Sequence, residues 1–191
     1  MRRGLQIYDF GFTILDFRKI RDFFYFCLVI SNSSISIRFA EKKDAPVILD
    51  LIKELALFEK APDEVTNTLE EIERDGFGEN AIFKCLMAEW KGEVAGISLY
   101  YIRYSTWKGR ILYLEDLIVS EKFRGKGMGK VLLERTLQEA ENMGVNGTRW
   151  QVLDWNEPAI EFYKKYNCTF DGEWINCNMD KKQLKKATAA E

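Results

Sequence analysis

The pattern of apolar and polar positions after residue 33 predicts one strand followed by two helices. Residues 34–39 alternate between the two kinds of side chain, which is typical of a strand with one buried face. A helix capped by Asp44 is expected next, because apolar side chains recur at helical spacing at Val47, Ile48, Leu51, Ile52, Leu55 and Phe58. Thr68 and Glu71 have the spacing of a capping box and predict a second, short helix that ends near Gly78.

The middle of the chain predicts three consecutive strands. Residues 82–90 and 94–104 are strand-like and flank the tight turn 91–93, a pattern typical of a hairpin. After a second turn, residues 110–120 form an apolar run that suits the middle of a sheet.

The C-terminal half predicts further helices and strands. An amphipathic helix ending near Gly144 is indicated by the spacing of Leu133, Leu137, Ala140 and Gly144. Beyond it we expect a fourth long strand, a helix capped by Asn156, one or two last strands and a helical tail, at residues 148–154, 156–166, 168–180 and 181–191. The expected order, β-α-α-β-β-β-α-β-α-β, describes an α/β fold with a mixed sheet in a single domain, residues 36–180.

The first 35 residues differ from the rest, and we interpret them as an extension outside this domain. Their apolar run, residues 23–30, is too short to span a bilayer, so no membrane partner is expected. Aspartates interrupt the approach to the run and no A-x-A-like site follows, which argues against a signal peptide. No C-x-x-C pair occurs, and reduced thiols in a cytoplasmic protein are expected at Cys27, Cys85, Cys168 and Cys177.

The absence of one residue type, histidine, limits the catalytic chemistry that the chain can perform. The chain has no histidine, which excludes a Ser-His-Asp triad, a Cys-His pair and an imidazole metal site. Proton transfer must therefore use a carboxylate, Tyr, Lys, Cys or water, and no metal is expected. The net charge of -2 gives no sign of a nucleic-acid binder.

The segment RGKGMGK, residues 124–130, lies between an apolar strand and the amphipathic helix. Free N–H groups at a helix start, flexible glycines and basic side chains together predict an anion site. A P-loop would need Ser or Thr where Val131 stands, and a dinucleotide fingerprint would need glycine at Lys130. A third pattern, R/Q-x-x-G-x-G/A, is matched by Arg124, Gly127 and Gly129.

This third pattern is that of the pyrophosphate loop of the GNAT acetyltransferases, and the chain resembles that superfamily over residues 36–180. The blocks LIKELALFEK, DGFGEN, YSTWKGR, LYLEDLIV and LDWNEPAIEFYKKY are similar to its diamine acetyltransferase branch, which includes spermidine/spermine acetyltransferase and thialysine N-epsilon-acetyltransferase. The resemblance implies the acyl-CoA N-acyltransferase fold, acetyl-CoA as co-substrate, a small amine as acceptor and a homodimer.

The resemblance also implies which residues hold the cofactor. Free backbone N–H groups would face the pantetheine and thioester at Leu117, Ile118 and Val119, although these are equally typical core residues. The pyrophosphate would be held by Arg124, Gly125, Lys126, Gly127, Met128, Gly129 and Lys130. Asn156 matches a cofactor contact, while helix capping alone also explains it. Tyr163 matches the tyrosine that protonates the leaving thiolate, with Tyr166 as the alternative, and a core role is the other interpretation of Tyr163.

The amine site implied by the resemblance is acidic. Glu115 is favoured as the base, acting through water. Its neighbour Asp116 is expected on the opposite face of the strand, so that only one of the two faces the substrate. Substrate-binding positions of the family match Phe58 and Glu59 at the end of the first long helix, where Glu59 is equally explained as a solvated charge. The amine site would also be lined by Asp154 and Trp155.

One turn suggests how long the amine acceptor is. Ser105 stands where spermidine-type members carry an acidic residue, which favours a shorter aminoalkyl acceptor such as thialysine, lysine or a small diamine. Two other functions stay open: a protein or peptide N-acetyltransferase, and a non-catalytic acyl-CoA sensor. The presence of both Glu115 and Tyr163 favours an enzyme.

Overall fold

The computed structural model describes residues 34–173 and 175–189 of the chain. The fold divides after Trp150 into two compact units. Of the predicted extension, only residues 34 and 35 are described, and Ile35 is the first residue of strand β1. Cys27 and the apolar run 23–30 lie outside the described residues, and the separation of the extension from the domain stays a prediction.

The first unit is built on a sheet in which the strands follow the order β1-β2-β3-β4-β5. The pairs β1–β2, β2–β3 and β3–β4 are antiparallel, whereas β5 runs parallel to β4. Their bounds are Ile35–Phe39, Lys84–Trp90, Glu93–Ser105, Gly109–Val119 and Thr148–Arg149. The interior position predicted for residues 110–120 is confirmed, because β4 has a strand on each side and buries residues 111–114.

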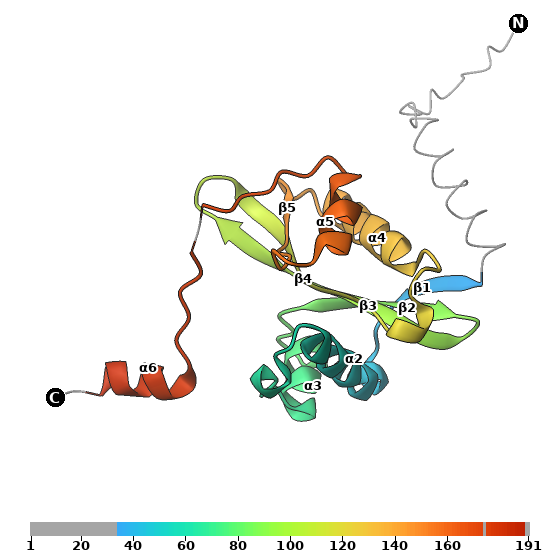
Figure 1. The fold of residues 1–191 in the computed structure, drawn as a ribbon. Helices are drawn as coiled ribbons and strands as arrows, with labels where there is room; N and C mark the ends of the chain where they lie inside the picture. Colours follow the sequence, from blue (N-terminus) through green and yellow to red (C-terminus); the bar gives the residue numbers. More distant parts are fainter. Residues whose placement is uncertain (1–33, 174, 190–191) are drawn as a thin grey trace, which may run out of the picture. The chain divides into compact units, whose positions relative to one another are not determined.

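Helices cover both faces of this sheet (Figure 1). α2 (Ala45–Phe58) and α3 (Leu69–Phe77) lie on one face, and α4 (Met128–Asn142) lies on the other. The core beneath α2 and α3 consists of the buried residues Ala45, Ile48, Leu51, Ile72, Cys85, Met87, Ile97, Leu99 and Ile118. Each large aliphatic side chain buried there contributes about 1.5–3 kcal/mol, so this core fixes α2 firmly against β3 and β4.

Asp44 precedes α2 as predicted, but its side chain does not cap that helix. It accepts a hydrogen bond from the backbone N–H of Glu41 at 2.7 Å and completes a capping box on the 3-10 turn η1 (Lys42–Asp44). It also pairs with the guanidinium of Arg38 at 2.6 Å. Hydrogen bonding to Arg38 outweighs the effect of burial and lowers the pKa of Asp44. The capping expectation was wrong because a nearby arginine competes for the same carboxylate.

Of the fourth long strand expected at residues 148–154, only the first two residues form a strand, and the rest of the prediction is wrong. Only Thr148 and Arg149 pair with β4, opposite Leu112 and Tyr113. Pairing in this register ends two residues before Glu115, the extra residue that interrupts the ladder of β4. The expected strand therefore shrinks to the two residues of β5.

The second unit contains helices α5 (Glu157–Lys164) and α6 (Lys181–Thr188). The Asn156 side chain caps α5 as predicted, accepting from the N–H of Ala159 at 3.3 Å, and α6 matches the expected helical tail. The strands expected between residues 168 and 180 are absent from the described part, 168–173 and 175–180. Asp, Gly and Asn recur in this stretch and disfavour strands, so the last strand of the predicted order was wrong.

Two further expectations concern bonding and membranes. The three described cysteines, Cys85, Cys168 and Cys177, form no disulfide within the described ranges. No helix in the described ranges is long and apolar enough to cross a membrane.

Candidate active site

The predicted acidic pair lies at an irregular point of β4. In the register with β3, Leu99 pairs with Asp116 while Tyr100 pairs with Leu114, so Glu115 is an extra residue on β4. Such a β-bulge bends the strand and re-aims side chains. The regular alternation that would place Glu115 and Asp116 on opposite faces does not apply across this extra residue.

Two neighbouring carboxylates act on Asp116 beside the bulge. Burial is the main cause that raises the pKa of Asp116 from 3.8 to about 6, and the negative charges of Glu115 and Glu59 raise it further. Glu59 directly follows the last residue of α2, and burial raises its pKa as well. Since the two negative charges oppose the ionisation of Asp116, a positively charged group placed here would stabilise its carboxylate. The cluster therefore favours a cationic ligand such as an ammonium group.

Two tyrosines beside Glu115 were missed by the sequence reasoning. The rings of Tyr101 on β3 and Tyr113 on β4 have centroids 5.4 Å apart. Burial and, next, the charge of Glu115 raise the pKa of both phenols. The available signal was the block YLED, in which Tyr113 precedes Glu115 by one strand repeat. The two aromatic rings thus lie beside Glu115.

After the bulge, the end of β4 has a strand neighbour on one edge only. Residues 117–119 pair with β3, whereas β5 pairs with β4 no further than Tyr113, and among the described residues no strand continues along that second edge. Strand pairing thus leaves that edge open to a ligand, which the splayed-strand expectation requires. Ile118 is buried in the core and Leu117 and Val119 are half-buried, so packing and backbone binding are compatible roles.

The glycine-rich segment forms an open loop that leads directly into α4. Gly127 precedes the first residue of the helix with a φ of 84°, and Gly125 has a φ of 75°. Both angles lie in the left-handed region that glycine adopts most easily. No atom lies within 4 Å of where a Cβ would stand at either position. The loop thus leaves room for a close backbone approach by an anion to the start of α4, which is what a bound pyrophosphate needs.

The basic side chains of the loop are held by nearby groups. Arg124 donates from Nε to the carbonyl oxygen of Val119 at 3.1 Å, and its guanidinium lies 4.9 Å from the centroid of the Phe58 ring. The Lys126 ammonium lies 5.3 Å from the Trp90 ring centroid. Lys130 is exposed on the first turn of α4. Aromatic rings and a backbone oxygen thus hold Arg124 and Lys126 at the loop, while Lys130 is exposed.

The second unit carries the predicted acid. Tyr163 lies in α5 and is buried, and burial is the main cause that raises its pKa to about 12. Its hydroxyl is therefore protonated at neutral pH, as a proton donor must be. Tyr166, the alternative, follows α5 and is half-buried. Asp154 and Trp155 lie exposed in the turn before the helix.

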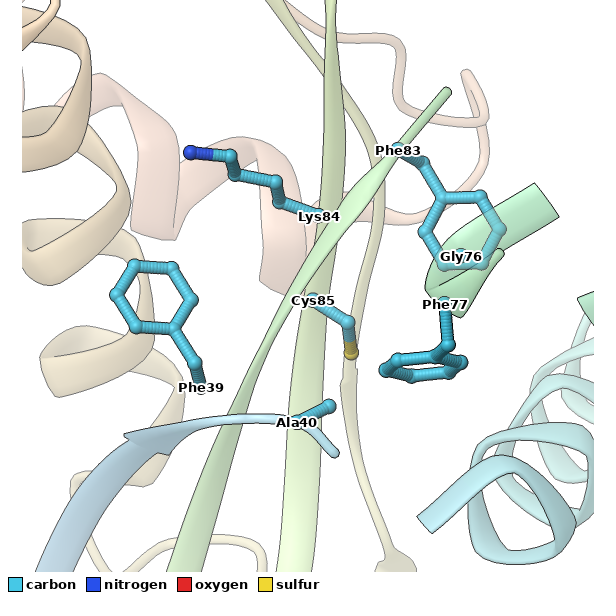
Figure 2. Close-up of a pocket in the computed structure, with 7 residues that line it drawn as sticks. All are labelled: Phe39, Ala40, Gly76, Phe77, Phe83, Lys84 and Cys85. Carbon is cyan, nitrogen blue, oxygen red and sulfur yellow. The ribbon is translucent and has the colours of Figure 1, made fainter. Parts of the chain in front are cut away.

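A hollow of about 280 Å³ lies in the first unit. Its lining comprises Phe39, Ala40, Gly76, Phe77, Phe83, Lys84 and Cys85. Figure 2 shows the Cys85 sulfur facing the Phe77 ring, with Lys84 directed to the other side of its strand. Burial raises the pKa of Cys85 to about 12, so this thiol is not a nucleophile at neutral pH. In the described ranges, no group of three potential ligand side chains is placed to hold a metal ion.

Comparisons with known proteins identify a family. The sequence model of the acetyltransferase (GNAT) family matches residues 48–167. Thialysine N-epsilon-acetyltransferase of Sus scrofa is 42% identical over 140 residues, which are 69% of this chain and 82% of that protein. Spermidine/spermine N(1)-acetyltransferase-like protein 1 of Homo sapiens is 40% identical over 140 residues, 70% of this chain and 20% of that protein.

Solved structures agree with the fold. An integron cassette protein from the mobile metagenome of V. cholerae has a TM-score of 0.68 at 22% identity, over 83% of this chain and 100% of that one. An aminoglycoside acetyltransferase from an uncultured soil metagenomic sample has a TM-score of 0.64 at 18% identity, over 76% of this chain and 95% of that one. The predicted superfamily and its mixed α/β fold are confirmed, and the chain belongs to the GNAT family of acetyltransferases.

Proposed function

We propose that the protein transfers the acetyl group of acetyl-CoA directly to a primary amine of a small aminoalkyl molecule. The observation that carries this proposal is the carboxyl cluster of Glu59, Glu115 and Asp116, which favours an ammonium group. The same unit holds the open glycine-rich loop, which suits a pyrophosphate. The names of the relatives, thialysine N-epsilon-acetyltransferase and a spermidine/spermine acetyltransferase-like protein, support the same class of acceptor.

The cofactor is proposed to bind along the end of β4 and the start of α4. Acetyl-CoA supplies a thioester, whose carbonyl carbon accepts the amine nitrogen. Residues 124–130 would hold the pyrophosphate through the first N–H groups of α4 and through their basic side chains. The free strand edge at residues 117–119 would donate N–H groups to the thioester oxygen, where negative charge develops. Asn156 is proposed as a further cofactor contact.

Proton transfers complete the proposed reaction. The ammonium loses one proton to Glu115 through water, its nitrogen forms the new N–C bond, and the C–S bond breaks. Tyr163, whose phenol is protonated at neutral pH, gives its proton to the leaving thiolate. The second proton that the nitrogen loses on becoming an amide replaces the proton of Tyr163 through water. Asp116 is ionised above pH 6 and would hold the cationic substrate in place. The other proposed contacts of the amine are Phe58, Glu59, Asp154 and Trp155.

The acceptor is proposed to be short, such as thialysine, lysine or a small diamine, with longer polyamines bound more weakly. Ser105 is the last residue of β3, before the turn to β4, and accepts from the N–H of Lys108 at 3.2 Å. A hydroxyl engaged in its own turn adds no negative charge for a second, distant ammonium group. Loss of that charge supports the shorter acceptor.

We further propose that the protein is a cytoplasmic homodimer. Free thiols at Cys85, Cys168 and Cys177 support a reducing compartment. Large apolar side chains stand exposed on both units, among them Trp107 at 83% and Ile175 at 90% exposure, and their burial against a second copy would be favourable. Sedimentation equilibrium tests this proposal, which a monomeric mass would contradict.

The experiment that tests the enzymatic proposal measures thiol release from acetyl-CoA with a panel of amines. The panel contains thialysine, lysine, putrescine, spermidine and a histone-tail peptide, and Tyr163→Phe and Tyr166→Phe are assayed beside the wild type. We expect turnover on a small amine that is largely lost in Tyr163→Phe and kept in Tyr166→Phe. Turnover on the peptide alone would indicate a protein acetyltransferase. Absence of turnover, with acetyl-CoA still raising the melting temperature, would indicate an acyl-CoA sensor.

A further inference from the structure

Helix α2 reaches across to the segment that connects β4 with the glycine-rich loop. The Oε1 atom of Glu54 accepts a hydrogen bond of 2.7 Å from the backbone N–H of Glu121. Glu121 begins the 3-10 turn η3 (Glu121–Phe123), which ends immediately before Arg124. The residue before it, Ser120, is held on the other side, since its N–H donates to the carbonyl oxygen of Ala95 at 2.9 Å. The start of the loop is thus fixed between β3 and α2.

A second contact joins the same helix to the loop itself. The guanidinium of Arg124 lies over the ring of Phe58, with 4.9 Å to the centroid, while its Nε donates to Val119. Phe58 is one turn beyond Glu54 on α2, so both contacts lie on neighbouring turns. The next residue, Glu59, contributes to the raised pKa of Asp116. The last turns of α2 therefore contact the loop and also carry one acid of the amine site.

The negative charge of Glu54 and its hydrogen bond to Glu121 should have opposite effects on CoA binding. A carboxylate beside an anion-binding loop opposes anion binding by Coulomb repulsion, so on charge alone its removal would tighten CoA binding. The hydrogen bond to Glu121 acts in the opposite direction, because it orders the backbone from which the loop begins. Glu54 is half-buried, and the bond joins residues that are far apart in sequence. The sign of the effect of removing Glu54 therefore separates the two roles.

We propose that Glu54 is a positioning residue for acetyl-CoA: its carboxylate holds the N–H of Glu121 and fixes the start of the pyrophosphate loop against α2. The proposal rests on the proposed function, because it takes residues 124–130 as the binding site of the cofactor. Glu54 touches neither the cofactor nor the reacting atoms in this role, and it acts only through the loop. The contact of Arg124 with Phe58 supports the same attachment.

The test measures CoA binding to the full chain by isothermal titration calorimetry. Glu54→Ala removes the acceptor, whereas Glu54→Gln removes the charge but keeps an oxygen that accepts the bond. The control is Asp50→Ala, since Asp50 lies four residues earlier on α2, is exposed and has no hydrogen bond or ion pair within the described ranges. We expect Glu54→Ala to weaken CoA binding about five- to tenfold, as expected for loss of a charge-assisted hydrogen bond near the surface. Glu54→Gln and Asp50→Ala should stay within about twofold of the wild type.

Kinetics distinguish positioning from a general loss of structure. In Glu54→Ala we expect the KM for acetyl-CoA to rise while kcat and the melting temperature stay near the wild-type values. Unchanged or tighter CoA binding in Glu54→Ala would overturn the proposal, as would a loss that Glu54→Gln does not restore. In both cases the proposed function stands if the wild type binds CoA. A wild type that binds no CoA would overturn both proposals together.

Discussion

The glycine-rich loop and the acidic pair of β4 follow one another closely in the chain, but different forces fix their geometry. The loop takes its shape from local residues: Gly125 and Gly127 adopt left-handed angles, and α4 begins immediately after them. The acidic pair takes its shape from strand pairing, since Glu115 is an extra residue relative to β3. The environment of Asp116 further depends on Glu59, which arrives from α2.

This difference assigns separate tasks to the two regions. A loop shaped by backbone angles recognises a part of the ligand that is always the same, the pyrophosphate. An acidic cluster assembled from β4 and α2 depends on which side chains those elements present, and can therefore differ between acceptors. Variants of the loop should change the binding of acetyl-CoA, and variants of the acids should change the handling of the amine.

The largest effect is expected at Glu115. Glu115→Gln removes the proposed base, and kcat/KM for the amine should fall about 10²- to 10⁴-fold at neutral pH, the usual range for loss of a general base. Asp116→Asn serves as the comparison, with a smaller fall that is seen mainly in the KM for the amine. Steady-state thiol release with both variants measures this. A larger loss in Asp116→Asn would move the role of base to Asp116.

The pH profile sharpens the same comparison. Since the pKa of Asp116 is about 6, this carboxyl is neutral below that pH and no longer attracts the ammonium group. We expect kcat/KM for the amine to fall below pH 6 in the wild type, and Asp116→Asn to lack this part of the fall. Binding of CoA to the loop should show no such step. A pH profile unchanged by Asp116→Asn would contradict the role given to its charge.

Asp116 should also lower the stability of the fold at neutral pH. Its folded-state pKa is raised from 3.8 to about 6, so the folded state binds more protons than the unfolded state between these values. The free energy of unfolding therefore decreases as pH rises through this window, by about 3 kcal/mol in total. Asp116→Asn should raise the melting temperature at pH 7, and the gain should disappear near pH 3. An equal gain at both pH values would indicate a cause other than ionisation.

A smaller effect is expected in the loop. Gly127→Ala places a side chain at a φ of 84° and should strain the loop by about 1 kcal/mol, which corresponds to about fivefold weaker CoA binding. Gly92→Ala is the matched control, because Gly92 has a φ of 83° in the turn between β2 and β3. Titration calorimetry should show weaker CoA binding in Gly127→Ala alone, while both variants lose similar stability. Equal CoA binding in the two variants would separate Gly127 from the cofactor.

The sequence predicted most elements that local patterns determine. The capping box of Thr68 and Glu71 and the cap of Asn156 are confirmed, because each satisfies backbone N–H groups within one helical turn. Features set by distant residues were not accessible in this way. Arg38 binds the carboxylate of Asp44 that was expected to cap α2, the pairing of β5 ends two residues before the extra residue Glu115, and the burial of Asp116 depends on the packing around it.

The same distinction holds within the candidate site. The loop could be located from its glycines and basic residues alone, and the bulge, the pair Tyr101–Tyr113 and the contact from Glu54 to Glu121 needed the three-dimensional register. The roles assigned to Glu115 and Tyr163 stay predictions. They rest on the resemblance and, for Tyr163, on the protonation state that burial favours.

Identification of the acetylated product by mass spectrometry tests the central claim most directly. The full chain is incubated with acetyl-CoA and an equimolar mixture of thialysine, spermidine and a lysine-containing peptide, beside Glu115→Gln as the inactive reference. The account predicts N-acetylation of the small amine, thialysine before spermidine, and its loss in Glu115→Gln. Release of CoA without an acetylated small amine, or acetylation of the peptide alone, would contradict it.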